Sequence, residues 1–380
     1  MPGLDLHVED AELLELRRRL SSTRWPAPWP TEPWQAGTDA GELRRLAAYW
    51  ADGYDWRAAE ARINQLPSFH TEIDGRRLHF LKFEGERPDA WPIVLTNGWP
   101  STFYEMVGLA ERLARPSEFG RPLDPCFTVV VPSLPGFTFS EQRPTLPADV
   151  PTPEIWHRLM SQELGFDRYF AHGGDLGAGI TSRLGIAHPE ALLGLHLMAV
   201  AAPAELDEST VTDEERGYLD RLARWSRDEG AYMHQHSTRP LTLAYALSDS
   251  PVGLLGWILE KYRAWSDSGG NLSSRFTDDF LLTQASLYWF TNTIGTSLRP
   301  YYEYGRGVER ALPRVPVPTA VALFPADIGQ PPRSWAERTY DVVRYTRMPA
   351  GGHFAPVEEP DLLAQDIAAF AADVTGRTTG

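Results

Sequence analysis

A glycine-rich corner after a short apolar run is the feature that most restricts how this chain can fold. Residues 169–180 read YFAHGGDLGAGI, so an apolar run leads through closely spaced glycines into a helix-compatible segment. This pattern predicts a strand, a tight turn and a helix, with Asp175 at the turn. Such a turn strains its central residue and brings strand and helix so close that flanking side chains would clash. A carboxylate held there can act as a nucleophile, while a helix N-cap is the alternative interpretation of Asp175.

Composition limits the class of protein. The 380 residues are 42% hydrophobic and carry a net charge of −15, which argues against nucleic acid and anionic membranes as partners. The single cysteine, Cys126, leaves no internal disulfide and no multi-cysteine metal site. The N-terminal residues lack the pattern of a signal peptide, and no window reaches the roughly 18 apolar residues of a membrane span. We therefore expect a cytoplasmic protein without a membrane anchor.

The first 78 residues differ in pattern from the rest. Helical spacing of apolar residues appears at 10–20, at 43–50 and from 55 to about 66, and residues 25–34 are rich in proline and tryptophan. That many exposed indoles would be unfavourable, so this segment is predicted to be a meander that packs onto another domain.

From residue 78 onward, short apolar runs alternate with amphipathic helical segments, which predicts an α/β protein with a mainly parallel sheet. A polar and aromatic segment of mainly helical pattern interrupts the alternation after the fifth run, and we interpret it as a lid. The predicted strands are 78–83, 93–96, 128–131, 169–171, 193–200, 319–324 and 342–346, and the predicted helices between and after them are 103–114, 153–164 and 361–374. The predicted parts are a meander at 1–78, a core at 79–200, a lid at 201–310 and the rest of the core at 311–380.

An acid and a histidine follow Asp175 in the chain order of the α/β-hydrolase fold. Asp327 comes just after a predicted strand, and His353 lies in a GGHF loop before the last helix. In this arrangement His353 is the general base, and Asp327 fixes its tautomer and stabilises its protonated form. The loop 97–100, NGWP, follows the second strand, where this fold places an oxyanion-hole N–H group. An ordinary turn is the alternative for that loop.

An aspartate nucleophile selects the substrate class. Its attack on a saturated carbon bearing a leaving group gives an ester that water can cleave, so epoxides and alkyl halides fit. An epoxide leaves as an alkoxide and needs a proton donor, which phenols of the lid can supply. The lid offers Tyr232 and Tyr301, and local sequence does not exclude Tyr288, Tyr302 or Tyr304.

These motifs together resemble the microsomal-type epoxide hydrolases, a family that includes the juvenile hormone epoxide hydrolases and bacterial relatives. The resemblance covers nearly the whole chain and is carried by residues 16–20, 49–57, 249–253, 260–261, 265–267 and 351–354. It implies that Asp175 is the nucleophile, that Asp327 and His353 form the charge relay, and that no cofactor or metal takes part. It also implies that Tyr232 and Tyr301 are the ring-opening acids and that Trp99 and Leu176 supply the oxyanion N–H groups.

The chain departs from that family pattern at three positions. Asn97 replaces the usual histidine, Leu176 the common tryptophan, and Asp327 a frequent glutamate. None of these three departures removes a catalytic group. Together they indicate an unusual epoxide as substrate, and an epoxide of bacterial secondary metabolism is one such substrate. The expected reaction converts an epoxide and water to a vicinal diol. A homodimer is one assembly that the sequence allows. The alternatives are a haloalkane-type dehalogenase and a non-hydrolytic enzyme that opens or cyclises a natural-product epoxide.

Overall fold

The fold is built on one eight-stranded, mostly parallel sheet. The computed structural model describes residues 3–144, 150–307 and 311–376. The strand order is β1-β2-β4-β3-β5-β6-β7-β8, in which β2 is antiparallel to both β1 and β4 and all other neighbours are parallel. The strands are β1 (Ser68–Ile73), β2 (Arg76–Phe83), β3 (Trp91–Thr96), β4 (Phe127–Pro132), β5 (Tyr169–Gly173), β6 (Leu192–Leu197), β7 (Val315–Leu323) and β8 (Tyr340–Arg347). The α/β class and the α/β-hydrolase fold are thus confirmed.

Each of the seven predicted strands is present, but the sheet begins earlier than expected. The edge strand β1 lies within residues 1–78, which the sequence assigned to the meander alone. Its turn to β2 is formed by Asp74 and Gly75, both with positive φ angles of 53° and 69°. An Asp-Gly pair in this conformation is a strong hairpin signal, and it was overlooked because the polar residues of β1 conceal its alternation. The strand predicted at 193–200 ends early, at Leu197.

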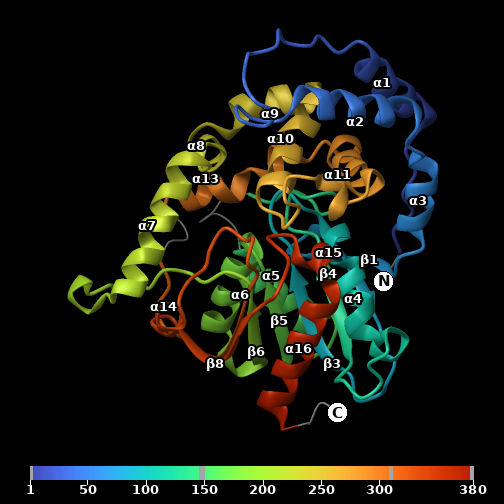
Figure 1. The fold of residues 1–380 in the computed structure, drawn as a ribbon. Coiled ribbons are helices and arrows are strands. Elements are labelled where there is room, and N and C mark those ends of the chain that lie inside the picture. The colour runs from blue at the N-terminus through green and yellow to red at the C-terminus, as the bar shows by residue number, and fades with distance from the viewer. Residues whose placement is uncertain (1–2, 145–149, 308–310, 377–380) are drawn as a thin grey trace.

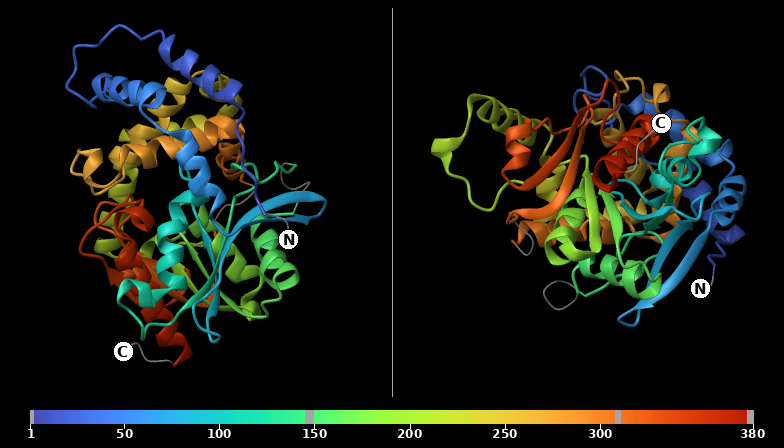
Figure 2. Two further views of the ribbon diagram at one scale, coloured as in Figure 1. Left: turned by 90° about the vertical axis from the view of Figure 1, so that its right-hand side faces the viewer. Right: turned by 90° about the horizontal axis from the view of Figure 1, so that it is seen from below.

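Two layers of helices cover the sheet (Figures 1 and 2). On one face, α4 (Val107–Ala114) packs beside α16 (Pro360–Thr375), and on the other α5 (Thr152–Arg158) packs beside α6 (Leu176–Ala187). The predicted helix 103–114 begins as the 3-10 turn η1 (Phe103–Met106), and the one at 153–164 ends as a π-helical turn over Leu159–Glu163. The shorter elements between the strands are η2 (Pro116–Phe119), η4 (Pro189–Ala191), η5 (Glu208–Thr210), α14 (Arg333–Glu337) and α15 (Ala355–Glu358).

A layer of helices inserted between β6 and β7 lies above the carboxyl ends of the parallel strands (Figure 1). This is the position in which open α/β sheets bind ligands. The inserted elements are α7 (Asp213–Asp228), α8 (Ala231–Thr238), α9 (Pro240–Asp249), α10 (Pro251–Ala264), η6 (Leu272–Ser274), α11 (Asp278–Thr291), α12 (Ile294–Ser297) and α13 (Arg299–Gly305). We call this set the lid.

The N-terminal helices lie across the outside of the lid (Figure 1). They are α1 (Asp10–Ser21) and α2 (Ala40–Asp52), and α3 (Trp56–Asn64) then leads down to β1. The indole N–H of buried Trp50 donates to the Ser286 hydroxyl at 3.0 Å, and Arg45 forms two hydrogen bonds with the Asp278 carboxylate. The N-terminal segment therefore packs on the lid, while the Trp29 side chain is 75% exposed.

None of the helices that the structure describes combines the length and apolarity needed to cross a lipid bilayer.

Candidate active site

Asp175 stands on the predicted turn between β5 and α6, in a strained conformation. Its φ and ψ angles are 49° and −124°, a region that residues other than glycine rarely adopt. The glycines make room for it: a Cβ at Gly177 would lie 2.1 Å from the Thr96 carbonyl oxygen, and one at Gly98 would lie 2.3 Å from the Asp175 Cβ. These side chains would clash, so the corner requires glycine. This turn holds the Asp175 carboxylate at the end of β5, beneath the lid.

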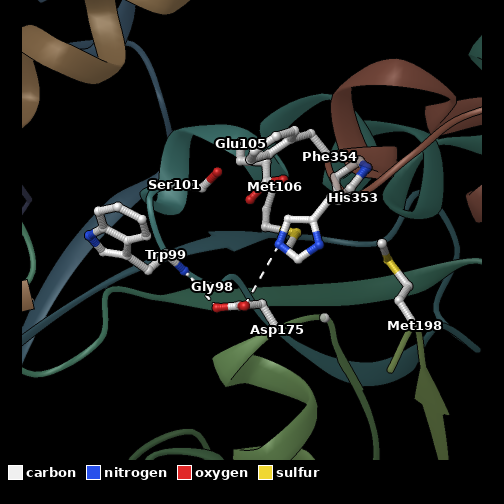
Figure 3. A pocket seen from close by; sticks show the side chains of 11 residues that line it. Gly98, Trp99, Ser101, Glu105, Met106, Asp175, Met198, His353 and Phe354 are labelled. Atoms are coloured by element: carbon white, nitrogen blue, oxygen red, sulfur yellow. Dashed lines mark hydrogen bonds and ion pairs between the residues drawn. The ribbon is translucent and has the colours of Figure 1, made fainter. Parts of the chain in front are cut away.

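One carboxylate oxygen of Asp175 lies in the predicted oxyanion hole. The Trp99 backbone N–H donates to Oδ1 at 2.9 Å (Figure 3), and the Leu176 N–H also stabilises the charged form. Burial raises the pKa of Asp175, while the charge of His353 and these two N–H groups oppose the rise. The Asn97 amide donates to the carbonyl oxygens of Gly98 and Ser101. Asn97, which stands where the family usually has histidine, therefore stabilises the loop by hydrogen bonds. The backbone N–H donors of the oxyanion hole are retained.

His353 joins Asp175 to Asp327, as the chain order predicted. Its Nδ1 lies 2.7 Å from Asp327 Oδ1, and its Nε2 lies 3.7 Å from Asp175 Oδ2 (Figure 3). The His353 backbone N–H donates to the Trp265 carbonyl at 2.8 Å, which ties the histidine loop to the lid. Burial favours the neutral imidazole, but the charges of Asp327 and Asp175 outweigh it and raise the pKa of His353 to about 9. The imidazole is therefore positively charged in the resting enzyme, with a proton on both nitrogens, and it faces the Asp175 carboxylate.

Tyr232 and Tyr301 come from different lid helices, α8 and α13, and meet near the nucleophile. Both are buried, and their ring centroids are 6.0 Å apart. Burial, and after it the negative charge of Asp175, raises the pKa of both phenols, so they remain protonated. The two phenols interact with each other, and among the described hydrogen bonds neither hydroxyl donates to a carbonyl or carboxylate oxygen of the protein. Both groups can therefore donate a proton to a ligand oxygen.

The other three candidate tyrosines differ in environment. Tyr288 is buried, but its hydroxyl donates to the Ser101 carbonyl at 2.9 Å. Tyr302 is half-buried, with the Arg306 guanidinium 4.6 Å from its ring centroid, and Tyr304 is 55% exposed. These surroundings favour Tyr232 and Tyr301 among the five.

Two buried acids near His353 were not predicted from the sequence. Glu358 accepts hydrogen bonds from the backbone N–H groups of Asp267 and Phe354, at 2.7 and 3.0 Å, and so fixes the histidine loop. Glu105, in η1, lies close to both His353 and Asp175 and is 5% exposed. An acid directly before the apolar run 106–110 was the available signal. In the described ranges, no three His, Cys, Asp or Glu side chains are grouped so as to hold a metal ion.

The comparison with known proteins agrees with this geometry. Residues 2–106 match the profile of the epoxide hydrolase N terminus, and residues 92–249 match that of the alpha/beta hydrolase fold. A relative from Stigmatella aurantiaca is 37% identical over 95% of this chain and 82% of its own. Epoxide hydrolase 1 of Sus scrofa is 33% identical over 96% of this chain and 87% of its own.

Two solved structures are similar over nearly the whole length. The Aspergillus niger epoxide hydrolase has a TM-score of 0.84 and 33% identity, covering 98% of this chain and 96% of its own. The juvenile hormone epoxide hydrolase of Bombyx mori has a TM-score of 0.89 and 28% identity, covering 98% and 94%. With the relatives above, this likeness shows that the chain belongs to the epoxide hydrolase family and is an epoxide hydrolase of the α/β-hydrolase fold.

Proposed function

We propose that the reaction begins with attack of Asp175 Oδ2 on a carbon of the epoxide ring. Oδ1 is held by the Trp99 N–H, so the carboxylate presents its other oxygen to the substrate. The C–O bond of the ring breaks as the ester bond forms, and the phenols of Tyr232 and Tyr301 give the leaving oxygen its proton. An alcohol product has a pKa of ~15 and an ordinary tyrosine one of ~10. Burial raises the pKa of both phenols and so reduces this difference, and the proton passes to the oxygen as the ring opens and its negative charge develops.

Water then cleaves the ester. His353 takes a proton from water, whose oxygen attacks the Asp175 carboxyl carbon, and the resulting oxyanion forms at Oδ1 beside the Trp99 and Leu176 N–H groups. Collapse breaks the bond to the diol oxygen, which receives the proton from His353. The second proton of the water then passes from the Asp175 carboxyl group to the tyrosinate left by the first step, which restores the Asp175 carboxylate and the phenol. Asp327 holds the imidazole by its Nδ1 throughout.

Loss of the Asp175 charge prepares the second step. In the resting enzyme that charge helps to raise the pKa of His353 to about 9. Esterification of Asp175 removes the charge, so the pKa of His353 falls and the neutral base becomes more populated when it is needed. The observation that carries this proposal is the placement of Asp175, with Oδ1 on the Trp99 N–H and Oδ2 facing the imidazole.

The test is mass spectrometry of the quenched enzyme during one turnover of an epoxide. Wild type should gain the mass of the substrate on the peptide containing Asp175, and Asp175→Asn should gain none, because an amide is a poor nucleophile. Diol formation without any adduct on that peptide would exclude the ester route. The same reaction in ¹⁸O-labelled water separates hydrolysis from internal cyclisation, and chloride release from haloalkanes tests the dehalogenase alternative.

A further inference from the structure

A small chamber lies beside the nucleophile on the His353 side. The volume of this chamber that the centre of a water molecule can occupy is about 10 Å³. Space of this size accommodates about one water molecule when polar partners are present. Asp175, His353, Ser101 and Glu105 contribute to its wall, and most of the rest is apolar. Neither Tyr232 nor Tyr301 belongs to its described lining, so it is separate from the phenols that we assign to the epoxide oxygen.

Glu105 is the one side chain of this chamber that the reaction above leaves without a role and that carries an ionisable group. It is almost fully buried, and Figure 3 shows it between Ser101 and His353. The other buried acid near the histidine loop, Glu358, uses both carboxylate oxygens to accept backbone N–H groups. Among the described hydrogen bonds, no backbone N–H is donated to the Glu105 carboxylate. The Ser101 hydroxyl interacts with it, which leaves an oxygen for a ligand in the chamber. A buried carboxyl group that lacks hydrogen-bond partners lowers the stability of the folded protein.

We propose that the chamber holds the hydrolytic water and that Glu105 is a positioning residue, which accepts a hydrogen bond from one O–H of that water while His353 removes the other proton. The assignment rests on the ester route. The water oxygen forms its bond to the Asp175 carboxyl carbon, its proton passes to His353 Nε2, and the ester bond to the diol oxygen breaks as that oxygen takes the proton back. Glu105 ends the cycle unchanged.

The charges around Glu105 change during the reaction. Burial is the main reason that its pKa is raised to about 8, and the negative charges of Asp175 and Glu358 add to the rise. The protonated imidazole of His353 and the hydroxyl of Ser101 act in the opposite direction. When Asp175 becomes an ester, the loss of its charge favours ionisation of Glu105, while the loss of the proton from His353 opposes it more strongly. An oxygen of the Glu105 carboxyl group can accept the hydrogen bond of the water in either protonation state. The negative charge of Glu105 in turn supports the protonated imidazole that forms as His353 takes the proton.

The experiment measures the two chemical steps separately, by quenched-flow mass spectrometry on an epoxide that forms a detectable ester. Glu105→Gln should form the ester within about threefold of the wild-type rate. It should hydrolyse the ester on the order of 10- to 100-fold more slowly, because the water loses its fixed orientation. Glu105→Asp, which retains a carboxylate, should recover part of the loss. Glu111→Gln makes the same change at an exposed position of the adjoining helix α4 and should leave both steps unchanged.

A second variant tests the chamber without changing a charge. A Cβ at Gly174 would meet Met198 at an ordinary distance of 3.6 Å, so Gly174→Ala should fold and place a methyl group in the chamber wall. It should also slow hydrolysis more than ester formation. Wild-type hydrolysis rates in both Glu105→Gln and Gly174→Ala, or equal slowing of both steps, would overturn the assignment. If wild type itself forms no ester, the ester route fails instead.

Discussion

The indole ring of Trp99 is stacked on the phenol ring of Tyr232, with centroids 5.5 Å apart and ring planes inclined by 11°. The backbone N–H of the same Trp99 donates to Asp175 Oδ1 at 2.9 Å. One residue of the core therefore positions both the nucleophile and one of the two lid phenols. A packed contact of this kind fixes the separation between attacking oxygen and proton donor, on which concerted ring opening depends.

The two phenols should share the proton-donor role. Removing one donor from a site that stabilises a developing oxyanion typically costs about 2.7–4 kcal/mol, on the order of 10²–10³ in rate. We expect Tyr232→Phe and Tyr301→Phe each to slow ester formation by that amount or less, because the other phenol remains. The double variant should lose nearly all ester formation. The measurement is the single-turnover rate of ester formation, with Tyr304→Phe on the exposed side of α13 as a control that should match wild type. A double variant with wild-type rates would transfer the donor role to another group.

His353 should be needed for the second step only. We expect His353→Gln to form the ester and fail to hydrolyse it, because carboxylate attack on the epoxide requires no general base and attack by water does. Intact-protein mass spectrometry should show stoichiometric adduct. The matched control is His234→Gln, which changes an exposed histidine of the lid helix α8 and should turn over normally. Steady diol production by His353→Gln would contradict the roles assigned to His353 and Asp327.

The pKa of His353 should depend on the charge of Asp175. In the resting enzyme it is raised to about 9, so the imidazole is protonated below that pH and loses its proton as the pH rises through it. Asp175→Asn carries no charge at this position, as does the ester, and should lower the pKa of His353. NMR titration of the imidazole in the two proteins measures the difference directly. Because the ester likewise lacks the Asp175 charge, the pKa of His353 in the ester should lie below 9. The rate of ester hydrolysis in wild type should therefore rise with pH and level off below pH 9.

A pKa of His353 that is unchanged in Asp175→Asn would show that Asp327 is the main acid that raises it, because Asp327 is hydrogen-bonded to the imidazole and Glu105 contributes less. Asp327→Asn provides the reference for that case, and it should also lower the pKa of His353.

Attachment of the N-terminal segment to the lid should depend on buried packing more than on its ion pairs. Trp50 is 3% exposed, and Trp50→Ala should cost about 3–5 kcal/mol of unfolding free energy. Arg45 is paired with Asp278, but its side chain is 48% exposed, so Arg45→Ala should cost about 1 kcal/mol or less. Urea denaturation of both variants distinguishes the two contributions. Equal losses would mean that the ion pair is worth far more than its exposure suggests.

The amino-acid sequence was sufficient to predict the fold class and to identify the candidate reacting groups. The closely spaced glycines around Asp175 indicate a tight corner between a strand and a helix. Asp327 just after a strand and His353 in the loop before the last helix follow in the chain order known for such a site. These signals are local in the chain, so they could be interpreted before any distances were known. The hairpin of β1 and β2 was also encoded locally, by Asp74 and Gly75, but the polar residues of an edge strand made its pattern weak.

The tertiary structure was needed to distinguish the environments of the tyrosines and of Glu105. Tyr288 and Tyr301 are both buried in lid helices, yet the Tyr288 hydroxyl donates to the Ser101 carbonyl, whereas the Tyr301 phenol interacts with Tyr232 and donates to no carbonyl among the described residues. Glu105 resembles any acid on a helix until the folded chain places it between Ser101 and His353 beside the nucleophile. Donor availability and pKa both depend on neighbours that are distant in sequence, because desolvation and charge act through space. The residue types that can perform the chemistry are therefore visible in the sequence, while the choice among them depends on which are buried together.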